Sequence, residues 1–136
     1  MNASTEQARL LLGKAGDDAF MMRELIKNPR SPSWGIGFHA QQAVEKALKA
    51  VLASHEVAYP FTHDLKLLLN LLASRAIHPP PQGETILSLL PYGAMLRYDA
   101  FPEDMEEGDL DRKLIEGVVT QVLEWAEAIL GKRGKA

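Results

Sequence analysis

The stretch FHAQQAVEKALKA, residues 38–50, carries the pattern that decides how this chain folds. At about 100° per residue, its apolar side chains cover most of the circumference of a helix. Four of its polar side chains fall within a single arc of roughly 80°, and Glu45 lies at the edge of this arc. Four residues form this polar stripe: His39, Gln42, Lys46 and Lys49. So wide an apolar surface predicts a helix that lies in the centre of a bundle and touches more than one neighbour.

The polar stripe admits two interpretations. It can be a solvated face, on which Glu45 and Lys49 form an i,i+4 ion pair worth only about 0.3–0.5 kcal/mol. It can also be the wall of a cleft, where two ammonium groups and an imidazole meet a phosphate or the carboxylates of a partner. Spacing alone favours the solvated face, because charged stripes are common on helices. Gln41 falls on the apolar side, where its amide needs buried hydrogen-bond partners.

Helical periodicity extends over most of the first half of the chain. A capping box at Ser4 and Gln7 begins a first helix, which ends near Asn28 ahead of the prolines in NPRSPS. The second helix runs from about Ser33 to His55. After the segment VAYPFT comes a shorter third helix, HDLKLLLNLLASR, with Thr62 as its N-cap.

The second half of the chain is less regular. A fourth helix is expected from about Gly83 to Tyr98, with a kink or a break where Pro91 removes a backbone donor. An acidic loop, DAFPEDMEEG, leads to a last helix that begins near Asp109. The expected buried face of this helix is Leu110, Leu114, Val118, Val122, Trp125 and Ile129. No segment alternates with period two over strand length. The sequence therefore predicts an all-α protein, an antiparallel four-helix up-and-down bundle with an additional short helix.

The composition is that of an ordinary globular protein. With 136 residues, 46% hydrophobic and 24% charged, the chain is expected to form one domain over residues 1–130, followed by a flexible basic tail at 131–136. A net charge of −3 argues against a general nucleic-acid-binding surface, and the absence of cysteine excludes disulfides and thiol chemistry. Neither a signal peptide nor an apolar run of ~20 residues is visible, so a cytoplasmic protein without a membrane segment is expected.

Motifs of metal and cofactor chemistry are missing from the sequence. Its four histidines show no HExxH and no close metal spacing, and there is no phosphate-binding glycine loop. No metal site and no cofactor are therefore assigned. His63 and Asp64 follow Thr62 at the expected start of the third helix, where helix capping is favoured over catalysis.

Three blocks of the sequence resemble the HEPN domain family. They are FHAQQAVEKALKAVL from residue 38, THDL at 62–65 and LRYDAF at 96–101, and they occur in the family's order over nearly the whole chain. The resemblance implies a small α-helical bundle, commonly a homodimer. In many members it also implies a neighbouring gene for a minimal nucleotidyltransferase, the two forming a toxin–antitoxin or nucleotide-binding pair. The polar stripe would then belong to a surface that the family shares.

The ribonuclease motif of the family is not present. Ribonucleolytic members carry an arginine followed, after four to six residues, by a histidine. The arginine holds the phosphate, and the histidine moves the proton of a ribose 2′-hydroxyl. Here Arg97 is followed by YDAFPED, with no histidine in the required window. No catalytic residue is assigned, and the sequence leans toward a protein that is not an enzyme.

Three functions remain open. The preferred one is a HEPN-type module that binds a nucleotide, an RNA or a nucleotidyltransferase partner, with contacts from the polar stripe, Arg97 and Tyr98. The second is a metal-independent RNase toxin, whose non-standard site combines Arg97 and Tyr98 with His39 or His63. The third is a purely structural oligomeric bundle.

A homodimer is expected on physical grounds as well. A small bundle with a broken fourth helix should leave part of the apolar surface of the second helix uncovered, and a two-fold dimer is the simplest closed way to bury it. Arg97 and Tyr98 are expected close to the cleft of this dimer.

Overall fold

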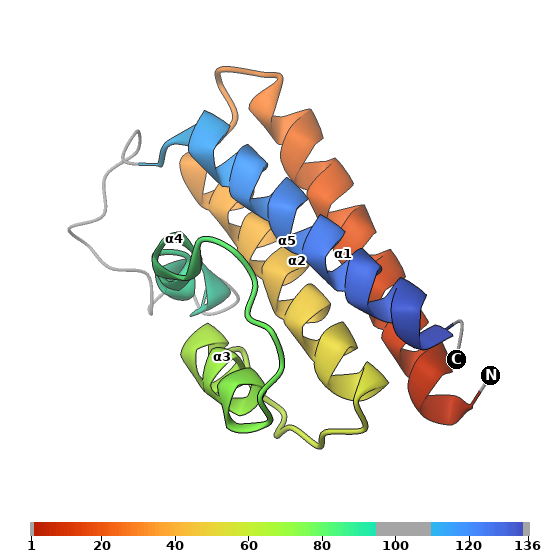
Figure 1. Ribbon diagram of the computed structural model, residues 1–136. Helices are drawn as coiled ribbons and strands as arrows, with labels where there is room; N and C mark the ends of the chain where they lie inside the picture. The colour runs from red at the N-terminus through yellow and green to blue at the C-terminus, as the bar shows by residue number, and fades with distance from the viewer. Residues whose placement is uncertain (1, 95–109, 135–136) are drawn as a thin grey trace.

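The computed structural model describes residues 2–94 and 110–134 of the chain (Figure 1). In chain order the elements are α1 (Ala3–Ile26), α2 (Ser33–Ser54), α3 (Leu65–Ser74), α4 (Gly83–Leu87), the 3-10 helix η1 (Leu90–Ala94) and α5 (Arg112–Gly134). Within the described residues there is no strand. The prediction of an all-α protein is confirmed.

Three long helices form the body of the molecule. α1 and α2 are antiparallel and joined by a short turn, and α5 packs against both of them (Figure 1). The ion pair of Arg9 with Glu127, at 2.8 Å, joins the beginning of α1 to the end of α5, and Arg23 donates to Thr120 at 2.9 Å further along the pair. α5 is therefore antiparallel to α1. The shorter α3, α4 and η1 lie along the other flank of α2, so the regular four-helix arrangement stays a prediction.

α2 is the central helix, as predicted. Its large aliphatic side chains, such as Ile36 and Leu48, have no exposed surface. Met22 of α1, Leu68 of α3 and Val119 of α5 belong to the same core. Burial of each such side chain contributes roughly 1.5–3 kcal/mol. The chain thus covers most of the apolar surface of α2 by itself, although Trp34 stays exposed, so a second subunit is not needed to bury this helix.

The helix starts differ by two residues from those predicted. α1 begins after Asn2, whose side chain accepts a hydrogen bond from the Thr5 amide at 2.8 Å, so Ser4 lies inside the helix. α3 begins after Asp64, whose carboxylate accepts two amides of the first turn. Thr62 precedes this cap and accepts the Asp64 amide at 3.0 Å. Asparagine and aspartate cap helices as well as serine and threonine do, so neighbouring candidates compete for each start.

The predicted fourth helix is broken. α4 ends at Leu87 and η1 begins at Leu90. Pro91 has no N–H to donate to the Leu87 carbonyl, so the α-helical ladder stops before the proline. Tyr98, the expected end of this helix, lies outside the described residues.

The last helix ends later than predicted, and its buried face differs from the expected one at one residue. α5 continues to Gly134, so residues 131–134 are helical rather than part of a tail. Val118 and Val122 are buried as predicted, but Leu114 is exposed.

Candidate functional site

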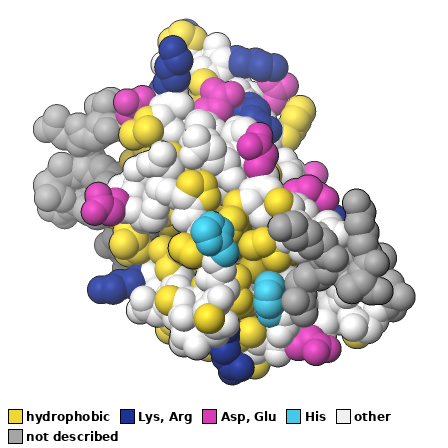
Figure 2. Space-filling view, in the orientation of Figure 1, with side chains coloured by type: hydrophobic (Ala, Val, Ile, Leu, Met, Phe, Trp, Pro, Cys, Tyr) yellow, Lys and Arg dark blue, Asp and Glu magenta, His cyan; other side chains and the backbone are white. Residues whose placement is uncertain are grey.

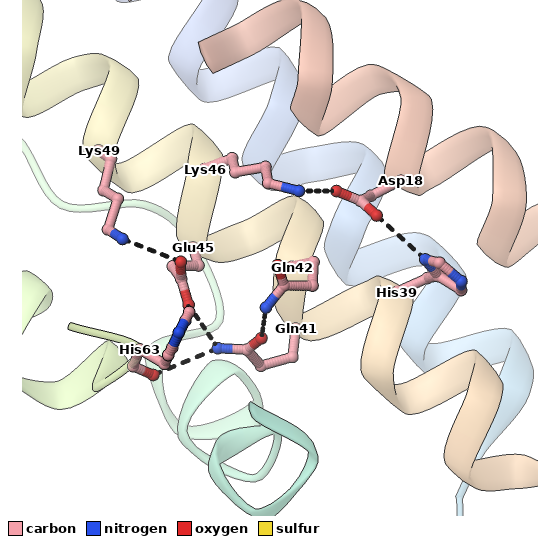
Figure 3. A network of polar contacts seen from close by, with 8 residues as sticks. All are labelled: Asp18, His39, Gln41, Gln42, Glu45, Lys46, Lys49 and His63. Carbon is pink, nitrogen blue, oxygen red and sulfur yellow. Dashed lines mark hydrogen bonds and ion pairs between the residues drawn. The ribbon is translucent and has the colours of Figure 1, made fainter. Parts of the chain in front are cut away.

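Polar side chains gather on the face formed by α1 and α2 (Figure 3). We call them the polar network: Asp18, His39, Gln41, Gln42, Glu45, Lys46, Lys49 and His63. Asp18 comes from α1, His63 from the segment before α3, and the others from α2. α5 runs behind α1 and α2 in this view, so the network occupies the side of the helix pair that α5 leaves uncovered.

Asp18 is the centre of the first half of the network. Its side chain is only 6% exposed. One carboxylate oxygen accepts a hydrogen bond from Nδ1 of His39 at 3.0 Å, and the other accepts from Nζ of Lys46. His39 and Lys46 lie two turns apart on α2, so the carboxylate from α1 bridges them. Both basic side chains remain partly exposed above it.

Glu45 is the centre of the second half. Its side chain is 4% exposed, and it accepts Nζ of Lys49 at 3.0 Å through one oxygen and Nδ1 of His63 at 2.9 Å through the other. The pairing of Glu45 with Lys49 was predicted from spacing. Of the two interpretations of the stripe, the solvated face does not fit this pair, because the Lys49 side chain is only 11% exposed. His63, at 44% exposure, is the most accessible member of this half.

Gln41 connects the members of the second half by hydrogen bonds from a buried position. It has no exposed surface, and its amide nitrogen donates to Glu45 at 3.1 Å and to the backbone oxygen of His63 at 3.3 Å. Its oxygen accepts from Gln42 at 2.7 Å. The prediction that Gln41 needs buried partners is confirmed.

Two glycines allow η1 to approach this part of α2. A Cβ added at Gly37 would lie 2.4 Å from the Tyr92 ring, closer than real side chains come. A Cβ added at Gly93 would lie 3.0 Å from the amide nitrogen of Gln41 and 3.5 Å from the backbone oxygen of His63. η1 therefore packs directly against α2 and supports the network from one side.

The charges of the network balance one another. Lys46 is paired with Asp18, and Lys49 is paired with Glu45. Each carboxylate is buried, so loss of either lysine would leave an uncompensated charge in a poorly solvated place. The groups that remain accessible to a ligand are the imidazoles of His39 and His63, the Gln42 amide and the exposed part of the Lys46 side chain.

Tyr59 lies close to the second half of the network. Nζ of Lys49 is 5.7 Å from the centre of its ring. Burial of the phenol and, secondly, the negative charge of Glu45 raise the pKa of Tyr59 above its ordinary value of 10.0.

A difference titration between the wild type and Tyr59→Phe, followed by ultraviolet absorbance, isolates this phenol. We expect the Tyr59 phenol to ionise above pH 10. In Glu45→Gln its pKa should fall toward 10 without reaching it, because burial is the larger cause of the raised pKa. Since the folded-state pKa is raised, the phenol contributes stability below pH 10 that is lost as pH rises through the folded pKa. The free energy of unfolding should then fall more steeply above pH 10 in the wild type than in Tyr59→Phe. Ionisation of the Tyr59 phenol at or below pH 10 would contradict this assignment.

The structure places all four residues of the predicted stripe in the polar network, His39 and Lys46 in its first half and Gln42 and Lys49 in its second. Arg97 and Tyr98 lie outside the described residues. Asp18 was missed, although its sequence signal is visible: it stands between Ala15 and Met22 on the buried side of α1. His63 was interpreted as part of a helix start and, in the RNase alternative, as a candidate for the site, and the contact of its ring with Glu45 was not predicted.

A model of the HEPN domain family matches residues 8–132. The chain belongs to the HEPN domain family. The match includes every residue of the polar network, so the network lies inside the HEPN domain. No curated protein and no solved structure shows a significant match to the chain.

The rest of this HEPN domain offers fewer candidate sites. Among the described residues, no group of three or more His, Cys, Asp or Glu side chains could hold a metal ion. None of the described helices combines the length and the apolar character that crossing a membrane requires. The face seen from the α5 side shows acidic and basic side chains scattered over it, without a continuous basic patch of the kind that binds nucleic acids (Figure 2).

Proposed function

We propose that this HEPN domain is a binding module whose contact surface is the α1–α2 face around the polar network. The observation that carries the proposal is the pairing of two buried carboxylates, Asp18 and Glu45, with basic side chains that stay accessible on that face. Burying charge is unfavourable unless it is paired, and such clusters gather at functional sites. α5 lies on the opposite side of α1 and α2 (Figure 3).

The proposed ligand is a nucleotide or a nucleotidyltransferase partner. His39, Gln42 and Lys46 would contact it directly, and Lys49 would hold Glu45 in place beneath them. We include Arg97 and Tyr98 among the contacts as a proposal from the sequence.

Calorimetric titration with a panel of nucleotides, and pull-down of the neighbouring gene product, test this function. Lys46→Ala should weaken the binding found by tenfold or more, because it removes a charge from the contact surface and leaves Asp18 unbalanced. Lys113→Ala, an exposed lysine on α5, should leave binding unchanged. If neither nucleotide nor partner binds, the proposal fails.

The module is proposed to act as a homodimer. Exposed apolar side chains on the same two helices support this proposal: Met21 on α1, one turn after Asp18, and Trp34 at the start of α2. Exposed apolar side chains next to a polar cluster are typical of protein interfaces.

One observation favours the alternative of a metal-independent RNase. The carboxylates hold Nδ1 of His39 and His63, which leaves Nε2 of each ring facing away from its carboxylate, the orientation of a general base. Purified protein should then cleave RNA without metal, and both Arg97→Ala and His39→Gln should abolish cleavage. His55→Gln, a histidine outside the network, is the control. Cleavage untouched by Arg97→Ala and His39→Gln would come from a contaminating nuclease.

A further inference from the structure

Both histidines of the network are held in the same tautomer. A carboxylate only accepts hydrogen bonds, so Nδ1 of His39 and Nδ1 of His63 each carry the hydrogen that points at Asp18 or Glu45. In the neutral ring, Nε2 then holds a lone pair and can only accept. In the protonated ring, Nε2 donates. Nε2 of each ring is therefore an acceptor when the ring is neutral and a donor when the ring is protonated.

The charged and titratable groups around the rings set the consequence of protonation. They are Asp18 and Lys46 at His39, and Glu45, Lys49 and Tyr59 near His63. The positive charges of the two ammonium groups balance the negative charges of the two carboxylates. Every proton taken up by a ring is therefore an unbalanced positive charge on the α1–α2 face.

We propose that His39 and His63 each bind an anionic oxygen group, a phosphate or a carboxylate, on this face when the ring is protonated. The inference rests on the proposed function, and it adds the chemistry and the regulation of the same site. A neutral ring turns a lone pair toward an anion, whereas a cationic ring donates a charge-assisted hydrogen bond to it. Binding should weaken as pH rises and the rings lose their protons. By linkage, the bound anion makes the rings hold their protons to higher pH.

The test is an NMR titration of the four histidines from pH 5 to 9, with sodium sulfate as probe and sodium chloride of equal ionic strength as reference. Sulfate stays a dianion over this range. We expect sulfate to move the titration midpoints of His39 and His63 upward by about 0.5 pH unit. This shift means that sulfate binds roughly threefold more tightly to the cationic ring than to the neutral ring. His55 and His78, which lie outside the network, should move less. At high pH, nitrogen shifts should show Nε2 without hydrogen in His39 and His63.

The variants His39→Gln and His63→Gln assign the resonances, and each should leave the response of the other ring in place. Acetate replaces sulfate in a second series: a response to both ions assigns the site to oxygen anions in general, and a response to one of them identifies the source. Equal shifts of all four histidines, or a hydrogen on Nε2 of the neutral rings, overturn the inference. The proposed function fails separately, if no nucleotide or partner binds at any pH.

Discussion

Replacing Glu45 by alanine is expected to lower the free energy of unfolding by about 3–5 kcal/mol, the range found when one partner of a buried ion pair is removed. The Glu45 side chain is 4% exposed and that of Lys49 is 11% exposed, so water cannot replace the lost carboxylate around the ammonium group. Gln41 and His63 lose the same acceptor. Urea denaturation followed by circular dichroism measures the change.

Two control variants separate burial of charge from loss of a contact. Glu127→Ala breaks an exposed ion pair with Arg9 and should lower the free energy of unfolding by less than about 1 kcal/mol. The double variant Glu45→Leu with Lys49→Met removes both charges and should recover much of the stability lost in Glu45→Ala. If Glu45→Ala is no more destabilising than Glu127→Ala, the network is solvated and the proposed site loses its basis.

Gly37→Ala is expected to destabilise the protein by about 1–3 kcal/mol, the range for overpacking a well-filled site. The added methyl group would lie 2.4 Å from the Tyr92 ring, so η1 has to move away from α2. Gly13→Ala is the matched control, because a Cβ added there meets nothing within 4 Å. Since alanine is the better helix former by about 0.5–1 kcal/mol, Gly13→Ala should stabilise the protein. Thermal unfolding of the two variants gives the sign of each change directly.

The clash itself can be tested by combining two substitutions. In a Tyr92→Leu background, Gly37→Ala should be less destabilising than in the wild type, because the ring that it meets has been removed. Equal effects of Gly37→Ala in both backgrounds would show that the close approach of η1 is not what requires glycine at this position.

The parts of the site that lie on one helix were predictable from the sequence. Helical periodicity placed α2 in the centre and put His39, Gln42, Lys46 and Lys49 on one side of it, because these properties depend on spacing within a single element. The partners of the stripe were not predictable in this way. Asp18 lies 21 residues from His39 and 28 residues from Lys46 along the chain, and only the packing of α1 on α2 joins them.

The errors have the same physical origin. Local signals placed the start of α3 near Thr62 and His63, but several residues there can cap a helix, and Asp64 does so. That choice leaves the His63 ring free to reach Glu45, a contact between segments 18 residues apart. The burial of the pair of Glu45 with Lys49 also depends on neighbours from other elements, including Tyr59.

The most direct test of the α1–α2 face as the contact surface is the mass in solution of three proteins, measured by light scattering at micromolar concentration. Met21 on α1 and Leu114 on α5 are matched, since both are apolar and are 40% and 48% exposed. We predict that the wild type has twice the 15.0 kDa mass of one chain. Met21→Glu should have the mass of a single chain, because its charge falls inside the interface, and Leu114→Glu should keep the mass of the dimer. A wild type of 15.0 kDa, or a dimer that Met21→Glu leaves intact, would contradict the account.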